Sequence, residues 1–160
     1  MAAKVIKIQD WLDCFKEATS ELTSSLRFDG TPAREVPSKG GEQANPGTYI
    51  AILTDTNSMH LGITSTPNGV RALARGLLGL RQDQEMSDQE AVDGVSEVMN
   101  IVAGKVKSKM AGRDGTLQLG LPMFVQTPIQ VNEQMERASA EVTIGPVACQ
   151  LLVFRNRRAA

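Results

Sequence analysis

The segment from Ser87 to Met110 restricts the fold more than any other part of the sequence. Ser87 is followed three residues later by Glu90, the S-x-x-E pattern of a helix capping box, and Ala111-Gly112 provides a stop. At about 100° per residue, its apolar side chains fall within about 120° of one another. A long helix with one apolar face must bury it, so the rest of the chain has to supply a packed layer. The predicted core-facing residues are Ala91, Val92, Val95, Val98, Met99, Val102, Val106 and Met110.

Four residues lie on nearly the opposite side of this predicted helix, within about 60° of one another. Glu97 and Asn100 are helical neighbours, with Cβ atoms about 5–6 Å apart. Gly104 follows Asn100 by one turn, where glycine costs the helix about 1 kcal/mol relative to alanine. Periodicity alone leaves two interpretations open, namely a docking surface and a solvated helix face with a tolerated glycine. The four residues, named the ridge from here on, are Asp93, Glu97, Asn100 and Gly104.

The remaining chain alternates between helical and strand-like periods. Apolar spacing predicts a first helix from Gln9 to Leu26, and "TYIAILTD" and "MHLGITST" flank "TNS" as in a hairpin. A second helix is predicted after Asn68, a plausible N-cap, with a packing face of Val70, Leu73, Leu77 and Leu78.

A loop rich in Gly, Pro and Ser, residues 29–47, follows the first helix, with a short strand expected around Glu35 and Val36. After the third helix, "LQLGLPMFVQ", "ASAEVTIG" and "VACQLLVFRN" predict three strands, the last two separated by Gly145-Pro146. The fold class is therefore α+β, with helices packed on a largely antiparallel sheet in the order α-β-β-α-α-β-β-β. We expect a single domain over residues 1–160.

Composition excludes several classes of function. The formal net charge of −1 over 160 residues gives no global field for nucleic acid or a membrane surface. No window of about 18 apolar residues and no signal peptide is present, so we expect a cytoplasmic protein. Cys14 and Cys149 are expected to be buried thiols, and His60, the single histidine, a hairpin side chain. Neither a metal site nor a Ser-His-Asp triad is supported, and Arg155, Arg157 and Arg158 are expected to form a solvated tail.

The stretch "DGVSEVMNIVAGKVKSKM" resembles the signature of the CheC/CheX/FliY family of bacterial chemotaxis phosphatases. The signature is Asp or Ser, three residues, Glu, two residues, Asn, and a Gly four residues on, which matches the ridge. "WLDCFKEATSEL", "VRALARGLLGL", "LGLPMFVQ" and "EVTIGPVACQLLVF" resemble other family elements. Among the branches of this family the chain most resembles CheX, because its first helix has Glu17 followed by Ser20 and lacks the Asn of a second site.

This resemblance implies a CheC-like α/β sandwich and a phosphatase that hydrolyses the phosphoaspartate of a CheY-like response regulator. Asn100 would position the attacking water, and Glu97 would pair with the active-site lysine of the regulator. Gly104 and Ala103 would let the regulator approach, and Asp93 would be either a partner contact or an ordinary surface charge. The chain would bind no cofactor itself, since the regulator supplies magnesium.

Two other classes of function stay open. One is a non-catalytic module of the same fold that docks a response regulator or a flagellar motor component. The other is a structural homodimer whose sheet edge pairs with a second chain, as CheX relatives do, and this is compatible with either activity. The presence of Glu97 and Asn100 as a pair favours the enzyme, because a scaffold needs neither.

Overall fold

The computed structural model describes residues 4–36, 45–127 and 129–157 of the 160-residue chain. Within these ranges the chain forms three helices and six strands. None of the described helices combines the length and apolar character that a membrane crossing needs. The elements are α1 (Ile8–Thr23), β1 (Gly47–Leu53), β2 (Met59–Thr64), α2 (Pro67–Leu78), α3 (Asp88–Met110), β3 (Gln118–Leu119), β4 (Met123–Val125), β5 (Met135–Ile144) and β6 (Val147–Asn156).

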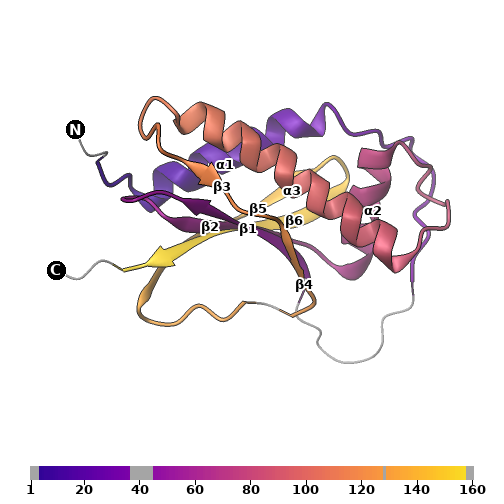
Figure 1. Cartoon of the computed structure of the whole chain (residues 1–160). Coiled ribbons are helices and arrows are strands. Elements are labelled where there is room, and N and C mark those ends of the chain that lie inside the picture. The colour runs from indigo at the N-terminus through magenta and orange to yellow at the C-terminus, as the bar shows by residue number, and fades with distance from the viewer. Residues whose placement is uncertain (1–3, 37–44, 128, 158–160) are drawn as a thin grey trace.

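The helices and the sheet form two layers, with the helices on one face (Figure 1). The described strands run in the order β3-β1-β2-β6-β5, β4 also pairs with β1, and the pairings between them are antiparallel. The α+β class and the helices-on-sheet architecture predicted from the sequence are therefore confirmed. The other face of the sheet carries Tyr49, His60 and Phe154, and the ring of Phe154 stacks on His60 at 5.1 Å between centroids.

The core lies between the layers because each element has one apolar face. Trp11 and Phe15 of α1 are fully buried against the apolar stripe of α3 and the inward side chains of the central strands. Of the predicted stripe of α3, Val92 alone is half-buried and the other residues are buried. Cys149 is buried and Cys14 half-buried, and both thiols are free.

Several predicted boundaries need correction. The stretch "LQLGLPMFVQ" is not one strand, because the chain between β3 and β4 contains Pro122, which has no N–H for a ladder. The first helix ends at Thr23 and not at Leu26, although Leu26 is still buried. Leu78 was expected on the packing face of α2 but is 49% exposed.

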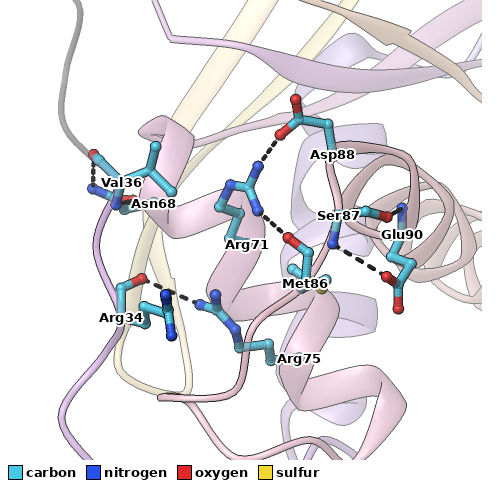
Figure 2. A network of polar contacts seen from close by, with 9 residues as sticks. All are labelled: Arg34, Val36, Asn68, Arg71, Arg75, Met86, Ser87, Asp88 and Glu90. Carbon is cyan, nitrogen blue, oxygen red and sulfur yellow. Dashed lines mark hydrogen bonds and ion pairs between the residues drawn. The ribbon is translucent and has the colours of Figure 1, made fainter.

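Asn68 does not cap α2. The cap is Thr66, whose Oγ1 accepts from the N–H of Gly69, and Pro67 occupies the first turn. The Asn68 amide instead accepts from the N–H of Val36 at 2.8 Å and donates to its carbonyl at 3.3 Å (Figure 2). Val36 thus pairs with a side chain and forms no strand, and residues 37–44 of the predicted loop lie outside the described part.

The chain end is also different from the expected tail. Arg155 lies in β6 with a side chain that is 10% exposed. It donates to the Glu136 carboxylate at 3.0 Å and to the Ile6 carbonyl at 2.7 Å, so it ties β5 and the N-terminal segment to β6. Arg157 is exposed, and Arg158 lies outside the described residues.

A buried polar cluster joins three distant segments at one end of the sheet. Asn57, in the β1–β2 turn, accepts from the N–H of Ile6 at 2.8 Å and donates to Asp114 at 2.9 Å. The other oxygen of Asp114 accepts from the N–H and hydroxyl of Thr116. Burial alone would raise the pKa of Asp114, but the hydrogen bonds from Thr116 and Asn57 outweigh it and lower that pKa.

We predict that Asp114→Asn lowers the free energy of unfolding by about 1–3 kcal/mol at pH 7, because two donors are left facing each other. The folded-state pKa of Asp114 is depressed, so its contribution is complete above the unfolded pKa of about 3.9 and disappears as pH falls through the folded value. Urea unfolding at pH 7 and pH 3 should therefore show the difference between the two proteins shrinking in acid. A pH-independent difference would contradict this role.

Candidate functional site

The ridge lies along the solvent side of α3. Asp93, Glu97 and Asn100 are exposed and Gly104 is half-buried, while Val98 and Val102 behind them are buried. In the described part of the chain, the side chains of Glu97 and Asn100 make no hydrogen bond or ion pair within the protein. A carboxylate and a carboxamide are thus displayed together, three residues apart on one helix, with their polar atoms available to a partner.

The N-terminal end of α3 is held by contacts from α2 and by its own cap. Ser87 and Glu90 form the predicted capping box, with both hydrogen bonds at 3.1 Å. Figure 2 shows Arg71 reaching from α2 to the carbonyl of Met86, at 2.9 Å, and to the carboxylate of Asp88. These contacts fix the position at which α3 begins, and with it the position of the ridge.

Arg75, a buried residue of α2, also holds the segment that connects α2 to α3. Arg75 is 1% exposed, and its guanidinium donates to the carbonyl of Gln84 at 2.9 Å. It also donates to the carbonyl of Arg34 at 3.5 Å (Figure 2). Burial, followed by the positive charges of Arg71 and Arg34, lowers the pKa of Arg75. The burial of this arginine had no signal in the sequence, because an Arg on a helix ordinarily faces water.

The C-terminal end of α3 is held by α1. Lys109 contacts the carboxylates of Glu21 at 2.5 Å and Glu17 at 3.1 Å, and Arg113 contacts Asp10 at 3.0 Å. Lys109 donates hydrogen bonds to Glu21 and Glu17, which raise the pKa of Lys109, and the bond to Glu21 lowers the pKa of Glu21. Glu17 is the acid on the first helix, where the Asn of a second site is missing. It is ion-paired with Lys109, whereas Glu97 has no ion pair within the described chain.

The predicted partner-binding residues differ in their placement. Ala103 is fully buried, because its position on α3 points toward the core, so the expectation that it contacts a partner is wrong. Asp93 is exposed and accepts from the Gln89 side chain at 2.8 Å, which leaves both interpretations of its role open. Gly104 is accessible, and a Cβ built on it would meet nothing within 4 Å.

Gly94 is a second glycine of α3 whose role sequence reasoning missed. A Cβ there would come within 2.6 Å of the Ala74 Cβ, so Gly94 allows the close crossing of α3 and α2. Gly104 has no such packing reason. A glycine in the interior of a helix is visible in the sequence in both cases. The structure shows that Gly94 is needed for packing against Ala74, whereas Gly104 leaves the helix surface without a side chain.

We predict opposite effects on stability for two matched substitutions in α3. Gly104→Ala should raise the free energy of unfolding by about 0.5–1 kcal/mol, because it gains helix propensity at a site with open space. Gly94→Ala should lower it by about 1–3 kcal/mol through overpacking against Ala74. Urea denaturation measures both. A destabilising Gly104→Ala would mean that the fold, and not an external contact, requires this glycine.

Solved structures similar to this one include a chemotaxis protein CheX and chains of a CheX–CheY complex and a FliM–SpeE complex. The chemotaxis protein CheX from Desulfovibrio desulfuricans matches with a TM-score of 0.67 and 17% identity, over 90% of this chain and 97% of that chain. A chain of the CheX–CheY–BeF3–Mg²⁺ complex from Borrelia burgdorferi matches with 0.63 and 13%, over 95% and 100%. A chain of the FliM–SpeE complex from H. pylori matches with 0.57 and 13%, over 96% and 90%. At these identities the likeness establishes the fold.

The family follows from the sequence itself. No curated protein matches the chain. The family model described as chemotaxis phosphatase CheX matches residues 48–144, more than half of the 160 residues, and this span includes the whole of α3 with its ridge. The chain therefore belongs to the CheX family of chemotaxis phosphatases.

Proposed function

We propose that this protein is a phosphatase that accelerates hydrolysis of the phosphoaspartate of a CheY-like response regulator in chemotaxis signalling. The observation that carries the proposal is the free, exposed pair of Glu97 and Asn100 on a helix held at both ends. Membership of a phosphatase family and the likeness to a chain of a CheX–CheY complex support it.

Asn100 has the chemistry that this reaction needs. Hydrolysis of an acyl phosphate requires a water in line with the leaving oxygen and stabilisation of the equatorial oxygens. An amide is uncharged and does not repel the phosphoryl group, and its carbonyl can accept from the attacking water while its amine donates elsewhere. In this proposal Asn100 orients the water, and the regulator supplies the Mg²⁺ and its own phosphate-binding residues.

Glu97 has a different role. A carboxylate would be a poor general base beside a phosphoryl group, because the two anions repel each other. In the proposal Glu97 instead pairs with the active-site lysine of the regulator, which fixes the register of docking and places Asn100 over the phosphoryl group. Gly104, one turn further on, leaves space for the regulator to approach the α3 backbone.

The rival function is a module that docks without useful turnover. The likeness to a chain of the FliM–SpeE complex keeps this alternative under consideration, since a shared fold does not fix activity. A docking module has no use for a free carboxamide beside the carboxylate, and the CheX family match favours the enzyme. We further place the protein in the cytoplasm, where response regulators act.

We also propose a homodimer formed by β5. Its outer edge is unpaired over ten residues within the described chain, whereas β3 and β4 at the other edge have two and three residues. A long unpaired edge is a template for another strand. Antiparallel pairing of two β5 strands about Ser139 would set the exposed Arg137 of each copy opposite the exposed Glu141 of the other.

We predict that Asn100→Ala lowers the rate of phosphate loss from the bound, phosphorylated CheY by a factor on the order of 10²–10⁴, because water positioning is lost. Its affinity for the regulator should change little. Phosphate release after phosphorylation by a small-molecule donor measures the rate, and Gln9→Ala, which removes an exposed amide of α1 away from the ridge, is the control.

Glu97→Ala should weaken docking and turnover together, whereas Glu17→Ala, on the ion-paired acid of α1, should leave the rate nearly unchanged. If the Glu97→Ala/Asn100→Ala double variant dephosphorylates CheY at the wild-type rate, the chain is not an enzyme of this kind.

For the dimer, we predict a sedimentation mass of twice 17.2 kDa for the wild type. Arg137→Glu sets like charges opposite each other across the proposed strand pair and should shift the protein toward monomer. Adding Glu141→Arg should restore the dimer, because the pair is then reversed. A dimer insensitive to both changes would place the interface elsewhere.

A further inference from the structure

A groove adjoins the ridge on its α1 side. Gly104 belongs to both features, so a partner that covers the ridge at this point also lies over the groove. The groove is shallow and open, and its lining residues come from α3 except for Glu21 of α1. The residues that line the groove are Glu21, Ile101, Gly104, Lys105, Ser108 and Lys109.

The part of the groove next to the ridge is open and partly apolar. Ile101 is half-buried and packs against the core, which leaves an apolar surface in the groove. Gly104 has no side chain, and the small Ser108 lies one turn further along. A side chain from outside can therefore enter here without displacing a long residue of α3.

The two lysines that line the groove differ in how closely they contact acidic side chains. Lys109 holds the carboxylates of both Glu21 and Glu17, at 2.5 and 3.1 Å. The nitrogen of Lys105 lies 3.9 Å from Glu21, whose charge Lys109 already compensates. Lys105 is therefore the loosely held cation of the groove, with a side chain that is 35% exposed.

Charge also changes sign along α3. Its N-terminal half carries Asp88, Glu90, Asp93 and Glu97, and its C-terminal half carries Lys105, Lys107 and Lys109. At about 100° per residue, Lys105 and Lys107 lie about 160° apart, one on the α1 side of the ridge and one on the other. Lys105 lines the groove and Lys107 does not, so the acid of a partner seated in the groove lies next to Lys105.

We propose that the groove seats a part of the response regulator in which an acidic side chain lies next to an apolar one, and that this acid pairs with Lys105. The inference rests on the proposed function and deepens it. The apolar side chain covers Ile101, and the acid lies above Lys105. With a cation at Glu97 and an anion at Lys105, the regulator can lie along α3 in only one direction, which is what aligns its phosphoryl group with Asn100. Lys105 is thus a docking residue that determines specificity and takes no part in the chemistry.

The test compares Lys105→Glu, Lys105→Gln and the matched charge reversal Lys107→Glu. The binding probe is a CheY response regulator loaded with beryllofluoride and Mg²⁺, titrated by calorimetry. We expect Lys105→Glu to weaken binding about tenfold or more, Lys105→Gln about threefold, and Lys107→Glu less than twofold. In turnover assays with phosphorylated CheY, Lys105→Glu should raise KM by the same factor and leave kcat unchanged. Thermal unfolding confirms that each variant is folded.

Each outcome separates the two proposals. If the wild type binds and dephosphorylates CheY but Lys105→Glu binds as the wild type does, the groove is not a docking site and the phosphatase proposal stands. Equal weakening by Lys105→Glu and Lys107→Glu would indicate a general charge effect and also overturn the inference. If the wild type neither binds the loaded CheY nor accelerates phosphate loss, both proposals fail.

Discussion

Burial of the apolar stripe of α3 is the constraint on which the rest of the structure depends. Val95, Val98 and Val102 lie against the sheet and the other helices, and burial of each such side chain contributes about 1.5–3 kcal/mol. A turn of the helix by one residue, about 100°, would expose this stripe and bury the Glu97 carboxylate without a partner. The interior of the protein thus determines which side chains α3 shows to solvent, and the solvent face can carry groups that serve only a partner.

The two ends of α3 are held by different means, with consequences for docking. Arg71 and the capping box fix its beginning against α2, and Lys109 fixes its end against α1. A ridge that is already held in place loses little conformational entropy on binding, so its contacts can be used to align the phosphoryl group and the water. The free carboxamide of Asn100 on this rigid support is consistent with a phosphatase that contributes orientation and leaves the metal to its partner.

Local pattern was sufficient for the helix that carries the site. The capping box, the apolar stripe and the ridge of α3 were all readable from residue spacing, and the Glu97–Asn100 pair is where the spacing placed it. What failed depends on contacts between distant segments. Ala103 is buried because other elements pack on that flank of α3, and Asn68 is drawn away from the cap by Val36. The Lys109–Glu21 pair joins residues 88 positions apart, which no periodicity within one element reveals.

The central claim is that the outward face of α3 is the surface that meets the phosphorylated regulator. Amide chemical-shift mapping of the isotope-labelled protein, with and without unlabelled beryllofluoride-loaded CheY, tests it most directly. The account predicts the largest shifts at the α3 positions from Asp93 to Ser108 and at the side-chain amide of Asn100, with smaller ones on the facing turn of α1. Shifts confined to the strand edges or to the opposite face of the sheet, with α3 unperturbed, would contradict it.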